Sequence, residues 1–252
     1  MSALEGRAGL VTGAAGGIGR ASAVRMAAEG AAVLVADLES EKARGEETVA
    51  MIRAAGGTAE FAACDVTLSE DAERLVALTV EHFGRLDFAH NNAGIGGGGK
   101  RIGDIDDELF DRVIAVNLRG VFLGMKYQIQ QMLRGGGGAI VNTSSNAGLR
   151  GVKLIGAYAA AKHGVVGLTK TAAMEYAEDG IRVNAVCPAA INTRWIQRAD
   201  PERAREIARP QAMKRFGEPE EVAAAVAWLC SDDASFVTGV AMPVDAGSVA
   251  GW

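Results

Sequence analysis

The sequence lacks the features that mark membrane, secreted and nucleic-acid-binding proteins. None of its apolar runs is long enough to span a bilayer, and residues 1–7 hold no apolar segment like that of a secretion signal. Lysine and arginine form no run, and the net charge of −5 leaves no basic surface for nucleic acid or an anionic membrane. We therefore expect a soluble, cytoplasmic protein that binds neither nucleic acid nor membranes.

Cysteine and histidine are scarce. The sequence has three of each, and the histidines show no spacing typical of metal ligands. The cysteines are odd in number, far apart and set among apolar residues, which indicates buried thiols rather than disulfides or metal ligands. They are Cys64, Cys187 and Cys230. No metal site is expected.

Apolar residues, by contrast, make up 49% of the 252 residues, which is enough for one substantial core. Short apolar runs alternate with segments of helical pattern along the whole chain, and this predicts a doubly wound α/β fold with a parallel sheet. The predicted strands cover residues 8–11, 31–36, 58–64, 86–90, 139–145, 181–187 and 240–245. The predicted helices cover residues 20–29, 40–55, 69–83 (with Ser69 as N-cap), 106–133, 218–230 and a segment that starts near residue 158. We expect residues 1–252 to form a single domain.

A glycine-rich turn follows the first predicted strand, over residues 12–19. Gly13, Gly17 and Gly19 permit positive φ, and with Ile18 they bring backbone amides close to a pyrophosphate at the start of the next helix. Taken alone, such a turn can also be an ordinary loop. The strand that follows decides between the two.

That next predicted strand ends in Asp37, about twenty residues beyond the glycines, as in dinucleotide-binding folds. A carboxylate at this place accepts hydrogen bonds from the adenosine ribose hydroxyls and repels a 2′-phosphate. Neither Gly16 nor Leu38 supplies a cation that would hold such a phosphate. Arg20 and Arg44 are the nearby basic residues that could, and the sequence does not fix their distance from the ribose. The sequence therefore predicts NAD rather than NADP as the cofactor.

Two further segments follow predicted strands, at the edge where parallel sheets bind their ligands. Asp65 and Val66 come after the third strand, and Asp65 is either an adenine contact or a helix or turn cap. Asn92, Ala93 and Gly94 come after the fourth strand. Asparagine and glycine tolerate the unusual backbone angles of a turn placed against a cofactor.

The long helix predicted over residues 106–133 contains Asn117, and Gly120 and Gly124 follow in the same segment. A buried asparagine in mid-helix is costly unless it is hydrogen-bonded, and the glycines loosen the helix. We therefore expect a local irregularity there.

Residues 189–216 show no sheet pattern and include Trp195 and Ile196, which we expect to be exposed. Segments of this length without a pattern are usually lids or substrate loops. We therefore expect residues 189–216 to form a substrate loop.

Tyr158 and Lys162 lie one turn apart at the start of a predicted helix and project from the same face. An ammonium near a phenol favours the phenolate and lowers the pKa of the tyrosine toward the working range, so the pair can act as an acid and base. The spacing also occurs by chance as an exposed pair. The nearby strand ending in Ser145, together with the glycine turn and Asn117, makes coincidence a poor explanation.

With these residues placed, the sequence resembles the classical short-chain dehydrogenase/reductase family over essentially its whole length. The motifs that carry the resemblance are the 12–19 turn, Asp65, the 91–94 turn, Asn117, Ser145, Tyr158 and Lys162. The resemblance implies a Rossmann-type fold with a seven-stranded parallel sheet, helices on both faces and NAD across the carboxyl edge. It also implies a homotetramer, and apolar surface on the helices around Asn117 and after Tyr158 leads us to expect at least a homodimer.

The resemblance also implies residue roles. Tyr158 exchanges a proton with the substrate oxygen, Ser145 hydrogen-bonds that oxygen, and Lys162 holds the nicotinamide ribose while tuning Tyr158. Asn117 anchors a water that links Lys162 to solvent. Further cofactor contacts fall on Pro188, Ile191 and Thr193.

The sequence departs from the family pattern in two places. Ala189 and Ala246 stand where the family usually has glycine. An alanine costs little at such a position unless the backbone requires positive φ.

The resulting hypothesis is an NAD-dependent oxidoreductase that interconverts a secondary alcohol and its ketone. Expected pocket walls around residues 146–157 are largely apolar, although they include Arg150 and Lys153, and they suit a cyclic or otherwise hydrophobic alcohol. The alternative is a catalytically idle NAD-binding or scaffold protein on the same fold. Related enoyl reductases space their tyrosine and lysine more widely, and related dehalogenating lyases lack the lysine.

Overall fold

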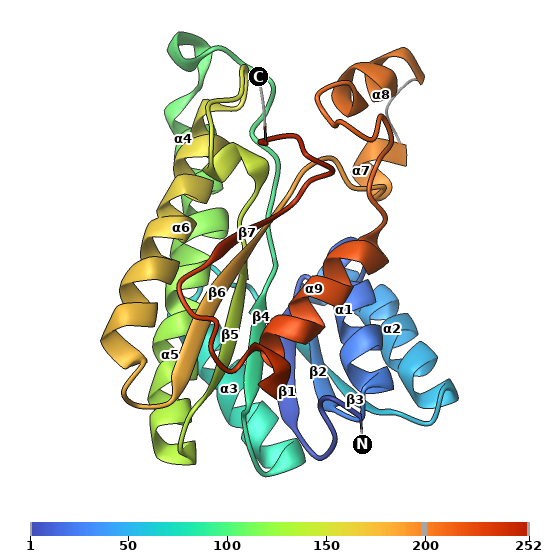
Figure 1. Cartoon of the computed structure of the whole chain (residues 1–252), viewed down its shortest axis with the longest axis vertical. Coiled ribbons are helices and arrows are strands. Elements are labelled where there is room, and N and C mark those ends of the chain that lie inside the picture. The colour runs from blue at the N-terminus through green and yellow to red at the C-terminus, as the bar shows by residue number, and fades with distance from the viewer. Residues whose placement is uncertain (1, 198–200, 251–252) are drawn as a thin grey trace.

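The computed structural model describes residues 2–197 and 201–250, and a single parallel sheet runs through the centre of this part of the chain (Figure 1). Its seven strands lie in the order β3-β2-β1-β4-β5-β6-β7, and every neighbouring pair is parallel. The strands are β1 (Ala8–Thr12), β2 (Ala32–Asp37), β3 (Thr58–Ala63), β4 (Phe88–Asn91), β5 (Gly138–Thr143), β6 (Ile181–Pro188) and β7 (Ala241–Val244). The predicted doubly wound, seven-stranded fold is confirmed.

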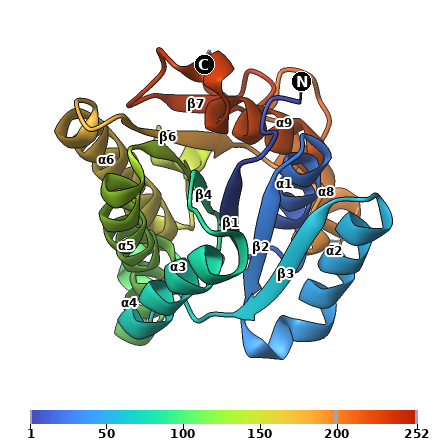
Figure 2. The same ribbon diagram turned by 90° about the horizontal axis from the view of Figure 1, so that it is seen from below.

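Helices cover both faces of this sheet, as the view along it shows (Figure 2). One face carries α1 (Gly17–Ala28), α2 (Lys42–Ala54) and α9 (Pro219–Cys230), and the other carries α3 (Ser69–Phe83), α4 (Asp107–Ile114), α5 (Gly120–Gly135) and α6 (Gly156–Tyr176). Two short helices, α7 (Arg194–Gln197) and α8 (Pro201–Ala208), project beyond the end of α9 (Figure 1). No helix in the described ranges is both long enough and apolar enough to cross a bilayer.

Two hydrophobic clusters, one on each face, explain the apolar runs of the strands. In β1, Val11 packs in the cluster beneath α1 and α9, whereas its neighbour Leu10 packs in the cluster beneath α5 and α6. Successive side chains of a strand point to opposite faces, so a sheet covered on both sides needs continuous apolar runs. These runs are what made the strands recognisable in the sequence.

The strand order reverses between β1 and β4, which lie side by side in the sheet although β2 and β3 separate them in sequence. A ligand-binding crevice forms at the carboxyl ends of strands where the order reverses. Here the turns that follow β1 and β4 are joined directly, because Thr12 Oγ1 accepts hydrogen bonds from the backbone N–H groups of Asn92 (3.0 Å) and Ala93 (3.1 Å). The fold thus brings the two predicted cofactor turns together.

The long helix predicted over residues 106–133 is interrupted as expected. Between α4 and α5, residues Ala115–Arg119 form a π-helix that contains Asn117. Such segments are rare and frequently lie at functional sites. The irregularity is confirmed, and the single predicted helix is in fact three consecutive helical segments.

Two local expectations were wrong. Ser69 was expected to cap α3, but Leu68 is the N-cap residue, and the Ser69 hydroxyl instead lies 2.8 Å from the Tyr127 hydroxyl. Ile196 was expected to be exposed, yet it is only 5% exposed and lines a pocket described below. The side chain of Trp195 lies outside the described part of the structure.

All three cysteines are free and buried, as predicted. Burial raises the pKa of the Cys64 and Cys230 thiols to about 12, so both are protonated at neutral pH.

Candidate active site

Four predicted catalytic side chains line one pocket of about 670 Å³ at the carboxyl edge of the sheet. They come from three elements: Ser145 from the end of β5, Tyr158 and Lys162 from the first turns of α6, and Asn117 from the π-helix. Lys162 is 2% exposed, and its Nζ donates a 2.8 Å hydrogen bond to the backbone carbonyl of Thr143. The same Nζ lies 5.5 Å from the centroid of the Tyr158 ring. The sequence spacing therefore does place the phenol and the ammonium together.

Neighbouring serines at the end of β5 have different partners. Ser144 Oγ donates to the backbone carbonyl of Lys162 at 2.8 Å, which anchors the start of α6 to the sheet. Ser145 Oγ accepts from the backbone N–H of Ala147 at 3.1 Å and donates to Asn146 Oδ1 at 3.2 Å. The Ser144 hydroxyl is thus committed to the α6 backbone, and Ser145 stays the predicted catalytic serine.

Asn117 fixes the loop that follows β4. Its Oδ1 accepts from the backbone N–H of Ile95, and its Nδ2 donates to the Ile95 carbonyl, both at 3.0 Å. Gly94 makes this approach possible, because a Cβ at that residue would lie 2.6 Å from Asn117 Oδ1. The buried amide is thus satisfied by backbone, and its predicted contact to a water stays a prediction.

Burial controls the charges of the Tyr158 and Lys162 pair. It lowers the pKa of Lys162 to about 8. It also raises the pKa of Tyr158, and hydrogen bonding by Ser145 opposes this only in part. The expected lowering of the tyrosine pKa by Lys162 is therefore wrong for this structure. Removing the phenolate from water outweighs the hydrogen bond of Ser145, the one effect that lowers this pKa.

A second pocket, of about 760 Å³, adjoins the first. It runs past the glycine-rich turn and the ends of β2 and β3, and it shares lining residues with the first pocket. The shared residues are Ile18, Asn92, Gly94, Ile95 and Thr193. The two pockets therefore form one continuous cleft, and each has a volume typical of small-molecule sites.

The residues of the second pocket fit a dinucleotide. The α1 helix begins at Gly17, which has φ of +54°. A Cβ added at Gly17 would lie only 3.2 Å from the methyl carbon of Thr193. A side chain there would fill the cradle in front of the first α1 amides, where a pyrophosphate binds. Asp37 supports the same turn, because its Oδ2 accepts from the Ala15 N–H and its Oδ1 from the Leu38 N–H, both at 2.9 Å.

Asp65 acts as a turn cap, and its contact to adenine stays a prediction. Its Oδ1 accepts hydrogen bonds from the backbone N–H (2.9 Å) and the hydroxyl (2.8 Å) of Thr67, so it caps the turn after β3. It also lines the second pocket.

Most of the predicted site residues line this cleft. The second pocket holds Gly13, Gly17, Ile18, Asp37, Asp65, Val66, Asn92, Ala93, Gly94 and Thr193, and the first holds Asn117, Ser145, Tyr158, Lys162, Pro188 and Ile191. Gly19 is the exception: it lines neither pocket and instead packs against the Gly13 carbonyl from inside α1. No group of three His, Cys, Asp or Glu side chains in residues 2–197 and 201–250 could hold a metal ion.

Comparison with known proteins gives a consistent result. Residues 13–248 match a family model described as Enoyl-(Acyl carrier protein) reductase. The chain is 46% identical to the 2,5-dichloro-2,5-cyclohexadiene-1,4-diol dehydrogenase of Sphingobium indicum, over 99% of this chain and 100% of that protein. The chain belongs to the short-chain dehydrogenase/reductase family.

Two other members of the short-chain dehydrogenase/reductase family are comparably similar. The cyclohexanol dehydrogenase of an Acinetobacter species is 47% identical over 94% of this chain and 92% of its own. A crystal structure of levodione reductase matches with a TM-score of 0.93 at 42% identity, and covers 99% of this chain and 100% of that one. These relatives are oxidoreductases of alcohols and ketones, and the family implies a nicotinamide cofactor for this member as well.

The two departures from the family pattern differ in their backbone. Ala246 has φ of +51°, in the left-handed region that favours glycine, whereas Ala189 is not among the residues with positive φ. The expected low cost of an alanine therefore holds at Ala189 but not at Ala246.

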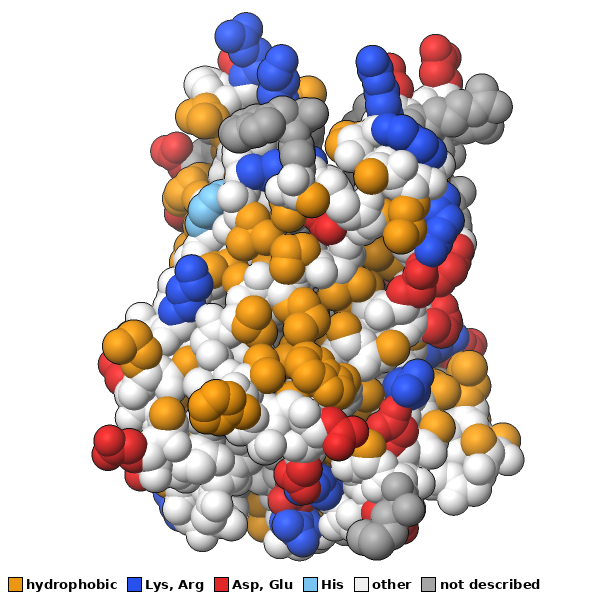
Figure 3. Space-filling view, viewed as in Figure 1, with side chains coloured by type: hydrophobic (Ala, Val, Ile, Leu, Met, Phe, Trp, Pro, Cys, Tyr) orange, Lys and Arg blue, Asp and Glu red, His pale blue; other side chains and the backbone are white. Residues whose placement is uncertain are grey.

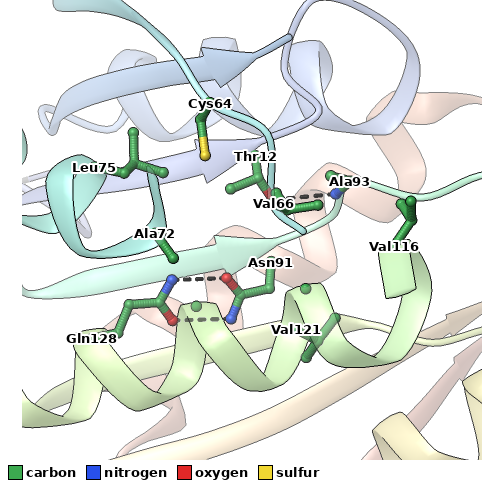
Figure 4. A pocket seen from close by; sticks show the side chains of 12 residues that line it. Thr12, Cys64, Val66, Ala72, Leu75, Asn91, Ala93, Val116, Val121 and Gln128 are labelled. Carbon is green, nitrogen blue, oxygen red and sulfur yellow. Dashed lines mark hydrogen bonds between the residues drawn. The ribbon is translucent and has the colours of Figure 1, made fainter. Parts of the chain in front are cut away.

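Behind the cofactor cleft, two buried amides pair face to face (Figure 4). Asn91 Nδ2 donates to Gln128 Oε1 at 2.9 Å, and Gln128 Nε2 donates to Asn91 Oδ1 at 2.7 Å. A Cβ at Gly124 would lie 2.6 Å from Asn91 Oδ1, so this glycine serves the close approach of α5 to β4. The pair ties the helix that follows the π-segment to the strand beneath the cofactor turn.

Sequence reasoning missed several residues of the site. Thr143 meets Lys162 through its backbone carbonyl, which no side-chain pattern could reveal. Ser248 lines the first pocket, close to Arg150. Ser248 lies far from Arg150 in sequence and belongs to no motif, so its place emerges only from the fold.

Proposed function

We propose that this protein is an NAD-dependent dehydrogenase that interconverts a secondary alcohol, cyclic or otherwise hydrophobic, and its ketone. The observation that carries the proposal is the convergence of Ser145, Tyr158 and Lys162 on a pocket continuous with a cleft suited to a dinucleotide. When bound, the nicotinamide accepts or supplies the hydride. The chain's own residues handle the proton and the oxygen.

Tyr158 exchanges a proton between its hydroxyl and the substrate oxygen, and Ser145 hydrogen-bonds that oxygen as its charge changes. Lys162 holds the nicotinamide ribose. A pKa of about 8 keeps its ammonium mostly protonated at neutral pH, beside Tyr158. Asn117 positions the loop at Ile95 that borders both pockets.

The preference for NAD rests on Asp37, which lines the cofactor cleft at the end of β2. Of the two nearby basic residues, Arg44 opposes this preference, because it lines the same cleft and its guanidinium lies over Gly16. Glu41 offsets that charge through a 2.5 Å ion pair with Arg44 Nη1. Arg20 is directed away, to the Ala15 and Arg44 carbonyls and to Thr48.

The apolar character of the substrate is supported by the pocket wall. Val152, Ile155, Ile196 and Ile207 line it, and two of them belong to the 189–216 segment that we propose as the substrate loop of a single-domain protein. Relatives named for cyclohexanol and for a cyclohexadiene diol favour a ring-shaped substrate. The enoyl-reductase description of the family model does not favour that reaction here, because Tyr158 and Lys162 stand one helical turn apart.

The proposal is tested by NADH absorbance with a panel of cyclic and linear secondary alcohols. We expect turnover with NAD and at least one cyclic alcohol. Tyr158→Phe removes only the hydroxyl, so it should lower kcat to below a few per cent of wild type while NADH still binds, as followed by its fluorescence. A protein that binds NADH but turns over no alcohol or ketone would favour the alternative of an idle NAD-binding scaffold.

A further inference from the structure

Arg150 is a cation in the substrate pocket without a carboxylate partner in the described part of the chain. It follows the short turn after Ser145 and lines the same pocket as Ser145 and Tyr158. Its Nη2 donates to Ser248 Oγ at 2.9 Å, and that is its one hydrogen bond within residues 2–197 and 201–250. Its Nε is buried and has no hydrogen-bond partner there. Its Nη1 also forms no hydrogen bond in these residues, but unlike Nε it is not enclosed, so the Nη1 donors are open to a ligand in the pocket.

A chain of hydrogen bonds holds Arg150 in a fixed relation to the reacting centre. Ser145 Oγ donates to Asn146 Oδ1, and Asn146 Nδ2 donates to Ser248 Oγ at 3.2 Å. Ser248 therefore accepts from Asn146 and Arg150 together, and it is only 3% exposed. The guanidinium is thus built into the pocket rather than free to turn into solvent.

The Ser248 end of this chain is itself fixed. The Asp245 carboxylate accepts from the backbone N–H groups of Gly247 (3.0 Å) and Val249 (2.8 Å), which shapes the turn that presents Ser248. The turn also fastens to the 189–216 segment, because the Ala212 N–H donates to the Ala246 carbonyl at 2.8 Å. Arg150 is therefore positioned by both halves of the pocket wall.

The charges of the pocket favour an oxygen acceptor at Arg150. The pocket's one acidic lining residue in the described ranges is Glu206, which is exposed and forms no ion pair with Arg150. A guanidinium presents several N–H donors in a planar fork, which suits a carbonyl or carboxylate oxygen. An apolar ring alone would cover the Nη1 donors without giving them an acceptor, and such an unmet donor is costly.

We propose that Arg150 determines specificity by binding a second oxygen function of the substrate, a carbonyl or carboxylate group, remote from the carbon that exchanges hydride. This inference rests on the proposed dehydrogenase function and narrows its substrate class. The preferred substrates are ring ketones and alcohols that carry two oxygen groups, one for Ser145 and Tyr158 and one for Arg150.

The test compares three ketones with NADH: cyclohexanone, cyclohexane-1,4-dione and 4-oxocyclohexane-1-carboxylate. Wild type should reduce at least one bifunctional ketone with a kcat/KM roughly 10- to 100-fold above that of cyclohexanone, the range expected for hydrogen bonds to a charged group. Arg150→Met should abolish this advantage while cyclohexanone stays within about threefold of wild type. Arg150→Lys should keep part of it for the carboxylate, because the charge remains but the fork is lost.

Lys153→Met is the matched control, because Lys153 is an exposed cation of the same loop that does not line the pocket. It should leave all three ketones unchanged. The proposal would be overturned if Arg150→Met lowered kcat/KM equally for every ketone, or did not lower it for any. An equal decrease would indicate that Arg150 only supports the loop, for example by pairing with Glu206. The relative rates of dione and carboxylate show which acceptor the site prefers.

A binding measurement separates this inference from the proposed reaction. Calorimetric titration of 4-oxocyclohexane-1-carboxylate and the dione into Tyr158→Phe with NADH needs no turnover. We expect weaker binding of at least one of them, by about tenfold or more, when Arg150→Met is added. If Arg150→Met leaves the affinity for both ligands unchanged, the proposed role of Arg150 is wrong, whether or not any ketone is turned over. If Arg150→Met weakens binding but wild type turns over no ketone, Arg150 binds the second oxygen and the proposed dehydrogenase function is wrong.

Discussion

The Lys162 ammonium donates to the Thr143 carbonyl at 2.8 Å, which joins the start of α6 to the end of β5 beneath the candidate active site. The bond satisfies one of three ammonium donors in a side chain that is almost wholly buried. Because burial favours the neutral amine, the charge of this residue is maintained at a cost in stability. That cost depends on pH.

The first prediction concerns this pH dependence. Burial lowers the pKa of Lys162 from 10.5 to about 8, so between these values the unfolded chain binds more protons than the folded one. The cost is fully present below pH 8 and disappears as the pH rises through this window. The free energy of unfolding of wild type, relative to Lys162→Met, should rise by about 1–2 kcal/mol between pH 7.5 and 9.5.

Urea unfolding at several pH values measures this difference. Lys153→Met, at an exposed lysine, should follow the wild-type curve throughout. A difference between wild type and Lys162→Met that stays constant with pH would show that Lys162 does not titrate in this window.

A second prediction concerns the cofactor. Repulsion between Asp37 and a 2′-phosphate should cost on the order of 2–4 kcal/mol, so wild type should prefer NAD by roughly thirty- to a thousandfold in kcat/KM. Asp37→Ala should lower kcat/KM with NAD and narrow the difference in kcat/KM between NAD and NADP. Arg44→Met should widen it, because this change removes the cation that faces the cleft beside Gly16.

Kinetics with both cofactors for the three proteins provide the measurement. Asp37 would not contact the adenosine ribose if wild type used NADP as efficiently as NAD. The same conclusion would follow if Asp37→Ala and wild type had the same ratio of kcat/KM with NAD to kcat/KM with NADP. Opposite shifts of the ratio in the two variants distinguish a charge effect from a general loss of fit.

The third prediction uses the two alanines that stand where the family usually has glycine. Ala246 has φ of +51°, and Ala246→Gly should relieve the backbone strain of an alanine in this region. Glycine loses more conformational entropy on folding than alanine, and after this loss is subtracted the free energy of unfolding should still rise by about 0.5–1 kcal/mol. Ala189→Gly has no such strain to relieve and should lower stability by about 0.5–1 kcal/mol. Chemical denaturation of both variants measures the two effects, and a change of the same sign in both would contradict the strain argument.

Assembly is the subject of the fourth prediction. Phe110, Phe122 and Met174, on α4, α5 and α6, are 42%, 48% and 86% exposed. A second gathering of apolar side chains covers the face that carries β7 and α9 (Figure 3), and Phe236 between these elements is fully exposed. Buried against copies of the same chain, the two surfaces would give a symmetric dimer or tetramer.

Light scattering should therefore give a mass above the 26.1 kDa of one chain. Phe122→Glu and Phe236→Glu test the two surfaces separately, and each should lower the mass if its surface is an interface. A monomeric wild type at micromolar concentration would exclude both interfaces.

The sequence predicted the sheet well because its strands are buried on both faces. A run such as 31–36 is apolar at every position, and the observed β2 (Ala32–Asp37) differs from it by one residue at each end. The α8 helix was not predicted, because half of its residues are charged and its sequence lacks a broad apolar stripe. The π-helix was anticipated as an irregularity, but its kind depends on Ile95, which is distant in sequence.

The candidate site was predictable where its residues share one helix or one turn. Tyr158 and Lys162 are fixed by helical spacing, and the glycine turn by its own pattern. Contacts that use backbone atoms or cross the chain were not predictable, as Thr143 with Lys162 and Arg150 with Ser248 illustrate. The pKa of Tyr158 was predicted with the wrong sign, because burial of the phenol is a property of the folded pocket.

The place of Ser248 has a practical consequence for handling the protein. This residue joins Asn146 and Arg150 by hydrogen bonds at the pocket, and the described chain ends only two residues later, at Ala250, whereas β1 begins at the opposite edge of the sheet (Figure 1). An affinity tag at the C-terminus would be held beside the candidate substrate site, so purification and immobilisation are better directed through the N-terminus. Activity lost with a C-terminal tag and recovered on its cleavage would reflect this proximity rather than misfolding.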